Sequence, residues 1–386
     1  MKLKLKETPE QIELIKAMGS KNAAVAREAS EAFAAFLGPV IQEVIQTAGT
    51  ANQIYSDAPF NEDDNPSYPL DLYYNENDGY ITVWSQHLAG GLPTSQVEGV
   101  AEMKIATYRL DSAVSWLKRY ARRSRLDVVS KAIERMATEV LIKQERNAWA
   151  VILRALAEAS TNVMSSGSAV ATKHMVASAT ENQFVLADMS TLMTRLKRIN
   201  ESFSGHTPVA PWSNGLTDLY VSPEVKGQIR AFAWNPLNTS GADTSGATAR
   251  NQTLPDNVRE EIYRGGGMQS IFGVNIHEMV ELGVGRKYNT LFDSFSSGNS
   301  VPGHDSDAWD DTSGGSTDEI LIGLDNSRGS FIRPVAREHE SGGTFTALPD
   351  EQFNAYGSRV EKVGFYGFLE EGRICIDSRA IAGIVI

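Results

Sequence analysis

The feature that most constrains the fold is one long helical pattern from Ser124 to Ala157, a stretch that contains no Gly or Pro. Its apolar residues recur at steps of three and four, which places them along one face of a helix. They are Leu126, Val129, Ile133, Met136 and Val140, followed by Ala148, Val151, Ile152, Ala155 and Leu156. A helix of this length would be roughly 50 Å long, well above the usual ~10–14 residues.

The polar residues 143–147 interrupt this apolar stripe, which argues against a continuous coiled coil. Ser124 can cap the helix, and Asp127 places a carboxylate in the first turn, where it suits the helix dipole. We therefore expect a single long helix that lies across a sheet. A long helix of this kind would also fit an ordinary α+β enzyme, so it does not decide the function by itself.

The composition narrows the class of protein. The chain has 386 residues, 41% of them hydrophobic, which is enough for a large core or two to three subdomains. Its formal net charge of −12 argues against generic binding to nucleic acid or to anionic membranes. A single cysteine excludes an intrachain disulfide. The N-terminus lacks the apolar segment of a secretory signal, and no stretch approaches ~18 apolar residues, so we expect a soluble protein without a membrane span.

The first hundred residues divide into a helical arm and a polar segment. Residues 8–46 are predicted to be helical, with a kink at Gly38-Pro39. Residues 54–100 are rich in Pro, Asn and acidic residues and contain little apolar sequence for a core of their own.

Two short runs within this polar segment, Leu70–Tyr74 and Tyr80–His87, flank a turn sequence that ends in Gly79, which is typical of a hairpin. A two-stranded ribbon is only marginally stable in water, so we expect it to lie on a partner surface.

The rest of the chain alternates between predicted strands and helices. Ser160–Asn182 is rich in Ser, Thr and Ala and is predicted to be a connector, and Asn235–Pro255 and Ser294–Ser316 are predicted to be polar loops. Helices are predicted at Ala187–Ile199, Pro223–Ala233 and Asp256–Tyr263, and strands at Lys104–Trp116, Leu219–Val221, Ile271–Met279, Glu319–Leu324, Phe331–Ala336 and within Val360–Ile386. The fold class is therefore α+β.

Charge is strongly segregated along the chain. From Glu28 to Met103 there are twelve acidic residues and no Lys or Arg, whereas from Lys104 to Arg125 there are seven basic residues and one acid, Asp111. An acidic segment next to a basic one favours pairing between them. Two solvated faces without pairing, or DNA binding by the basic residues, would also be consistent with this pattern, although the acidic balance and few interleaved aromatic residues disfavour DNA.

The sequence contains no recognisable catalytic or metal-binding constellation. His277-Glu278 lacks the second His of a zinc helix, and the six histidines have no ligand spacing. The acidic residues Asp305, Asp307, Asp310 and Asp311 do not complete a calcium loop, because Trp309 occupies a ligand position and the Gly is missing. The Gly265–Gly267 run is read as a helix end, and Cys375 as an inert core thiol. We expect no enzyme activity, no metal and no cofactor.

Several stretches resemble the major capsid proteins of tailed bacteriophages. The run TYRLDSAVSWLKRYARRSRLDVVSKAIERMATEVLIKQERNAWAVILRALA looks like their strand and spine helix. LYVSPEVKGQIRAFAWN is similar to the strand and helix that open their axial domain, MQSIFGVNIHEM to a returning strand, and RICIDSRAIAGIVI to their closing peripheral strands. The resemblance rests on the order of elements over nearly the whole chain rather than on one motif.

This resemblance implies a tailed-phage major capsid fold with a division of labour along the chain. Residues 1–53 would form an N-terminal arm and 54–101 an extended loop, a β-hairpin that reaches over a neighbouring subunit. Residues 102–180 and 356–386 would form the peripheral domain with the spine helix 124–157, and 181–355 the axial domain, whose loops meet at capsomer centres. The implied function is self-assembly into hexamers and pentamers that form an icosahedral head around double-stranded DNA.

The resemblance also implies partners and a location. These are a separate scaffolding protein, a portal protein, a decoration protein in some assemblies, and packaged DNA bound without sequence specificity, in a virion assembled in the host cytoplasm. Some relatives join subunits by an isopeptide bond from a Lys in the extended loop. That chemistry is absent here, because residues 54–101 contain no Lys. Only about 50 residues precede the loop, which is why we expect the scaffolding protein to be a separate chain.

Combining the charge pattern with the resemblance gives a specific hypothesis for contacts between subunits. Acidic residues of one subunit would face basic residues of another. The acidic set is Asp57, Glu62, Asp63, Asp64, Asp71, Glu76 and Asp78, and the basic set is Lys118, Arg119, Arg122, Arg123 and Arg125.

Two other functions remain open from the sequence. One is an encapsulin-type nanocompartment shell protein, which keeps the fold but encloses cargo enzymes; the added length in 235–255 and 294–316 favours the phage alternative. The other is a soluble α+β enzyme with an unrecognised site.

Overall fold

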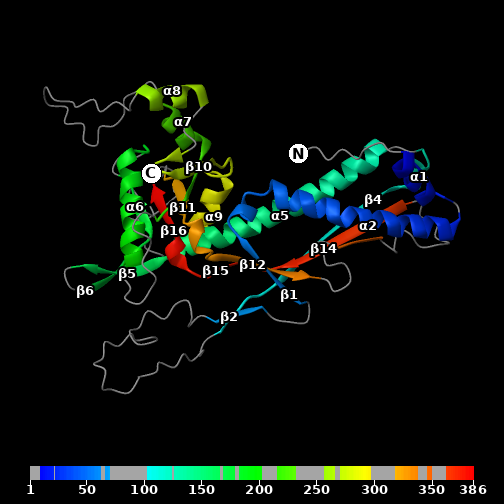
Figure 1. Cartoon of the computed structure of the whole chain (residues 1–386), viewed down its shortest axis with the longest axis horizontal. Coiled ribbons are helices and arrows are strands. Elements are labelled where there is room, and N and C mark those ends of the chain that lie inside the picture. The colour runs from blue at the N-terminus through cyan, green and yellow to red at the C-terminus, as the bar shows by residue number, and fades with distance from the viewer. Residues whose placement is uncertain are drawn as a thin grey trace, which may run out of the picture. The chain divides into compact units, whose positions relative to one another are not determined.

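The computed structural model describes residues 9–20, 22–61, 66–69, 102–123, 126–165, 168–178, 182–201, 215–231, 256–265, 270–296, 318–337, 346–349 and 362–386. The chain forms two compact units, each made of segments that are distant in sequence (Figure 1). Unit 1 comprises Met1–Tyr68, Met103–Ala148 and Phe331–Ile374, and unit 2 comprises Pro69–Glu102, Trp149–Ser330 and Cys375–Ile386. The domain bounds expected from the resemblance remain a prediction.

Unit 1 combines helices with a six-stranded sheet. Its helices are α1 (Pro9–Met18), α2 (Ala23–Ala48), the short η1 (Ala51–Gln53), α4 (Lys118–Arg122) and the first part of α5 (Leu126–Glu158). The strands of its sheet are β1 (Ser56–Asn61), β4 (Tyr108–Leu117), β12 (Phe331–Arg337), β13 (Thr346–Pro349), β14 (Lys362–Glu371) and β15 (Ile374–Cys375). The order is β1-β12-β14-β13, with β15 paired to β12 and β4 to β14, while β2 (Ser67–Pro69) and β3 (Glu102–Lys104) form a separate pair.

The pairing of β14 with β4 builds the inner face of this sheet. The two strands run antiparallel over ten residues, from Lys362 opposite Leu117 to Glu371 opposite Tyr108. Side chains alternate between the two faces of a strand, so Val363, Phe365 and Leu369 are buried, whereas Tyr366 and Phe368 are only half-buried.

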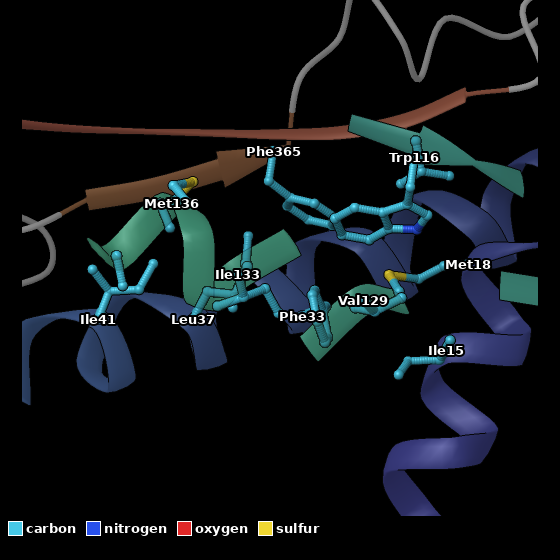
Figure 2. Packing of buried hydrophobic residues seen from close by; sticks show 14 of the residues in the cluster. Ile15, Met18, Phe33, Leu37, Ile41, Trp116, Val129, Ile133, Met136 and Phe365 are labelled. Atoms are coloured by element: carbon cyan, nitrogen blue, oxygen red, sulfur yellow. The ribbon is translucent and has the colours of Figure 1, made fainter. Parts of the chain in front are cut away.

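The core of unit 1 lies between this sheet face and three helices (Figure 2). The rings of Trp116 and Phe365 stack with centroids 5.4 Å apart, and Phe33 of α2 lies 5.3 Å from Phe365. The predicted stripe of α5 supplies Val129, Ile133, Met136 and Val140 to the same cluster, and α1 and α2 add Ile15, Met18, Leu37 and Ile41. The expectation of a long helix across a sheet is confirmed, because α5 spans 33 residues.

Unit 2 is built on a second six-stranded sheet. Its helices are the last part of α5, α6 (Leu186–Glu201), α7 (Pro223–Ala231), α8 (Asp256–Gly265), α9 (Lys287–Ser296) and the short η2 (Asn326–Arg328) and η3 (Ser378–Ala380). The sheet order is β7-β16-β11-β8-β10-β9, and β5 and β6 form a separate hairpin. The strands are β5 (Ser160–Ser165), β6 (Ser168–Lys173), β7 (Met175–Ala177), β8 (Asp218–Val221), β9 (Ser270–Ile271), β10 (Val274–Glu278), β11 (Ile320–Leu324) and β16 (Ile381–Val385).

The core of unit 2 surrounds this second sheet. Central strands β8, β11 and β16 are buried along their whole length, as expected of strands covered on both faces. The ring of Trp149 lies 4.9 Å from Tyr220 and 5.9 Å from Tyr288, so the end of α5 packs on aromatic residues from β8 and α9.

Two expectations from the sequence differ from the structure, and one helix of the structure had no counterpart among the predicted elements. The N-terminal helix is interrupted at residues 19–22, where Asn22 caps α2 by accepting a hydrogen bond from Ala24 N at 3.2 Å, and α2 then continues through Gly38 and Pro39. The segment Ser160–Asn182 contains β5, β6 and β7 and is not a plain connector, because Val163 opposite Val170 and the buried β7 give it strand pairing. Helix α9 was not predicted.

The predicted ribbon strands at 70–74 and 80–87 lie outside the described residues, as do residues 235–255 and most of 294–316.

Phe33 gives a direct test of the unit 1 core. Phe33→Ala removes a ring that is 3% exposed and should lower the free energy of unfolding by about 3–5 kcal/mol, through lost apolar burial and the cavity left behind. The matched control is Phe36→Ala on the same helix, whose ring is 40% exposed and should cost about 1 kcal/mol or less. Urea unfolding followed by circular dichroism measures both, and equal shifts of the midpoint would contradict this packing.

Candidate inter-subunit surface

A short basic helix follows β4 and leads toward α5. Helix α4 contains Lys118, Arg119 and Arg122, and Arg123 follows as its C-cap. Two of these cations lie in the last turn, where positive charge suits the helix dipole. Arg119, Arg122 and Arg123 are exposed and Lys118 is half-buried. Among the residues that the structure describes, none of the four forms an ion pair with an acidic side chain.

Two of these side chains are held by their own subunit. The Nε atom of Arg122 donates a hydrogen bond to the carbonyl oxygen of Gly19 at 2.8 Å, which ties α4 to the break between α1 and α2. A Cβ atom at Gly19 would lie 2.8 Å from Cγ of Arg122, so the glycine allows this close approach. The guanidinium of Arg119 lies 5.1 Å from the ring centroid of Tyr120 and donates to its hydroxyl at 3.3 Å. The surface is therefore partly preorganised.

Only one member of the predicted acidic set lies within the described residues. Asp57, in β1, accepts a hydrogen bond from Nη1 of Arg333 at 3.3 Å within the same chain. The two residues are also opposite each other in the parallel pairing of β1 with β12. Its carboxylate is 48% exposed, but it already has an intrachain partner. Glu62, Asp63, Asp64, Asp71, Glu76, Asp78 and the basic Arg125 lie outside the described residues.

A buried ionic cluster that the sequence analysis did not predict lies at the end of β14. The carboxylate of Glu371 is fully buried, and Oε2 accepts hydrogen bonds from Nε of Arg333 at 2.8 Å and from Nε2 of Gln144 at 3.0 Å. Its Oε1 accepts from the hydroxyl of Tyr108 at 2.9 Å and from Arg373 at 3.4 Å. A buried charge is tolerated only when it is paired and hydrogen-bonded, and Glu371 meets both conditions.

The surroundings of this cluster shift the proton equilibria of its neighbours. Burial raises the pKa of Tyr108 to about 12, and the Glu371 carboxylate adds to the rise, so the phenol stays a hydrogen-bond donor. Burial acts to lower the pKa of Arg373, but the Glu371 carboxylate together with Tyr108 and Tyr55 outweighs burial, so the pKa is raised. The guanidinium of Arg373 also lies 4.8 Å from the ring centroid of Tyr55.

Weak signals for this cluster exist in the sequence. Gln144 belongs to the polar residues that interrupt the apolar stripe of α5, and Arg333 and Glu371 lie within mainly apolar strands. A charged residue within a strand core requires a partner, but sequence alone does not identify that partner.

The described residues contain no group of three or more His, Cys, Asp or Glu side chains that could hold a metal ion. Burial raises the pKa of Cys375 to about 12, which keeps its thiol protonated and unreactive. The side chain of His277 forms a hydrogen bond with Asp218, in which Nε2 of the imidazole lies 2.8 Å from Oδ1 of the carboxylate. No helix in the described part of the chain has the length and apolar character needed to cross a membrane.

This chain is similar to several solved structures of capsids. No family model matches the sequence, and no curated protein is significantly similar to it. Among solved structures, the capsid of cyanophage P-SCSP1u is similar over 87% of this chain and 88% of its own, with 12% identity and a TM-score of 0.49.

Two further structures extend the comparison to other particles. The capsid of the empty GTA particle is similar over 88% of this chain and 90% of its own, with 12% identity and a TM-score of 0.44. The virus-like particle from Pyrococcus furiosus is similar over 90% of this chain and 97% of its own, with 10% identity and a TM-score of 0.41. All three TM-scores lie below 0.5.

The buried cluster gives a stability prediction. Glu371→Ala leaves the guanidiniums of Arg333 and Arg373 in a buried site without their shared carboxylate and should lower the free energy of unfolding by about 3–5 kcal/mol. Asp57→Ala is the control, because this carboxylate is half-exposed and its loss should cost about 1 kcal/mol or less. The midpoint of urea unfolding reports both, and a Glu371 variant as stable as the control would exclude the cluster as a major constraint.

Proposed function

We propose that this chain is a major capsid protein of the tailed-bacteriophage type, which self-assembles into hexamers and pentamers of an icosahedral head around double-stranded DNA. The observation that carries the proposal is the segregation of charge between an acidic segment and the basic α4 surface. By the same proposal the protein is structural rather than enzymatic and is located in the virion.

The charge distribution supports assembly because the basic residues of α4 and its C-cap have no acidic partner within the described part of the chain. Lys118, Arg119, Arg122 and Arg123 have no acidic partner among the described residues, while the chain from Glu28 to Met103 carries twelve acids and no cation. The acidic segment of a second copy would supply the partner for this basic surface. Exposed ion pairs contribute only about 0–1 kcal/mol each, but a shell repeats each contact in every subunit. Such contacts should weaken as ionic strength rises.

The architecture is consistent with the order of elements in the family that the sequence resembles. A strand (β4) leads through α4 into the 33-residue α5, which contributes residues to both units. We infer that residues 54–101 are the extended loop over a neighbouring subunit and that the remaining segments form the arm, peripheral and axial domains as expected. Scaffolding, portal and decoration proteins would be the partners of such a shell.

Particle formation is the first test. Purified chain, analysed by size-exclusion chromatography and negative-stain electron microscopy, should give capsomers or closed shells rather than a small discrete oligomer. Double-stranded DNA inside particles isolated from their source would support the phage head, and packaged cargo enzyme would instead indicate an encapsulin-type compartment. A stable monomer or dimer at every concentration would contradict assembly altogether.

Charge reversal tests the pairing itself. Arg119→Glu combined with Arg123→Glu should block assembly, because the changed surface repels the acidic segment, and Asp63→Lys with Asp64→Lys in the same chain should partly restore it. Arg122 is left unchanged, because its hydrogen bond to Gly19 would make a loss of folding hard to separate from a loss of pairing.

The control for this test is Arg27→Glu combined with Arg154→Glu. It changes the net charge equally at two exposed residues, each in a pair with a residue four positions later in its own helix. Sedimentation velocity at low and high salt measures the assembled fraction for all variants. Assembly by the Arg119 and Arg123 variant, or absence of any rescue, would refute the pairing.

A further inference from the structure

The β5–β6 hairpin of unit 2 is a two-stranded sheet of its own (Figure 1). Its strands run antiparallel from Ser160 opposite Lys173 to Ser165 opposite Ser168. In the described part of the chain, neither strand joins the six-stranded sheet of unit 2. A two-stranded hairpin is at best marginally stable in water, so a hairpin paired over this length needs support from a further surface.

The base of the hairpin is fixed to the rest of unit 2. The backbone N–H of His174 donates to the carbonyl of Ala159 at 3.2 Å, and Gly383 N of β16 donates to the carbonyl of His174 at 3.1 Å. Nη1 of Arg195 on α6 donates to the carbonyl of Lys173 at 2.9 Å. Helix α6 also packs against β5. The hairpin therefore leaves unit 2 in a defined direction, and β6 is the strand whose outer edge is available for pairing.

This edge lacks the protection that the other strand edges of the described chain have. An unpaired edge can pair with a strand of another molecule, and proteins prevent this with charged residues, Pro or short strands. Strands β1, β2, β3, β4 and β13 contain charged residues or Pro, and β7, β9 and β15 have only two or three residues. In contrast, residues 160–172 contain no charged residue and no Pro. Strand β6 has six residues, and its single charge is at Lys173, its last residue.

A second copy of this chain is the occupant that fits the edge of β6. The formal net charge of −12 makes two copies repel each other, but β6 adds no acidic residue to that repulsion. A two-fold axis places two identical strands antiparallel, so that the N–H and C=O groups of each edge face those of the other. Because an edge of six residues buries far less than the ~1,200 Å² of a stable interface, the contact should form where assembly already brings copies together.

We propose that the β6 edges of two copies pair antiparallel across a two-fold axis, so that their two hairpins form one continuous four-stranded sheet. This inference rests on the proposed self-assembly, and it adds a contact distinct from the pairing of the acidic segment with α4. Positions 170 and 171, at the middle of β6, lie next to the axis, where a residue is opposite the same residue of the other copy.

Single cysteines in the assembled full chain test this pairing. Opposite residues of an antiparallel pair have Cα atoms about 4.5–5.5 Å apart, a separation that a disulfide can span. Val170→Cys or Ala171→Cys should therefore give a disulfide-linked dimer on oxidation with copper phenanthroline, measured by non-reducing gel electrophoresis.

The matched control is Val163→Cys, because Val163 lies opposite Val170 on the other strand of the same hairpin. It should give about tenfold less dimer, since its edge is not the one that pairs across the axis. The native Cys375 is buried and its pKa is raised to about 12, so the unmodified chain should give no dimer.

Charge at the axis provides a test that does not need oxidation. Ala171→Lys places two lysines near each other across the axis, and Ala171→Glu does the same with two carboxylates. Like charges on neighbouring strands oppose pairing, so each variant alone should need about fivefold more protein to assemble. An equimolar mixture of the two variants should restore assembly, because Lys then faces Glu. Recovery in the mixture separates loss of pairing from loss of folding.

The outcomes distinguish this contact from assembly itself. Particles that form normally but in which neither β6 cysteine cross-links more than Val163→Cys would overturn the hairpin contact and leave self-assembly standing. A mixture of the Lys and Glu variants that assembles no better than either variant alone would overturn the contact in the same way. A chain that stays monomeric at every concentration would overturn both the proposed self-assembly and this contact.

Discussion

The fold of unit 1 depends on how it accommodates the carboxylate of Glu371. A buried charge without partners is prohibitively costly, so the groups around it must come together in one arrangement. They come from four places: Arg333 on β12, Tyr108 on β4, Gln144 on α5, and Arg373 just beyond β14. A shift of β14 by one residue would turn Glu371 to the opposite face and break all of these contacts. The cluster therefore fixes strand register and helix position together.

Within the described chain, the cations on α4 lack the acidic partners that the charged side chains of the Glu371 cluster have. Within unit 1 the buried guanidiniums are paired, and even half-exposed Asp57 pairs with Arg333. On α4, four cations face the surface without an acidic partner in the described chain, although the hydrogen bond from Arg122 to Gly19 and the contact of Arg119 with Tyr120 hold two of them in place. Preorganised, unpaired cations suit recognition more than stability, because an exposed pair adds little to folding but can select a partner.

Sequence periodicity predicted the parts of this fold that are set by local patterning. The stripe from Val129 to Val140 predicted α5 to within two residues at its start, and the strands predicted within Val360–Ile386 include β14. It did not predict β5 to β7, since their Ser and Ala residues have little preference for strands and these segments pair only in context. The Glu371 cluster could not be predicted from the sequence either, because Gln144 and Glu371 are 227 residues apart and their contact depends on the completed fold.

Two buried carboxylates, Glu371 in unit 1 and Glu319 in unit 2, show why burial alone does not decide the chemistry of an acid. Glu371 receives an amide, a phenol and guanidinium groups, so its negative charge is compensated where it lies. Glu319 is nearly as buried, yet it has Ser222 as a donor, a second acid nearby and one oxygen without a partner. In unit 1, hydrogen bonds and paired charges offset the cost of desolvating the Glu371 carboxylate. In unit 2, the cost of desolvating the Glu319 carboxylate is not offset in this way. For that reason a change of pH in the neutral range should change the protonation of Glu319.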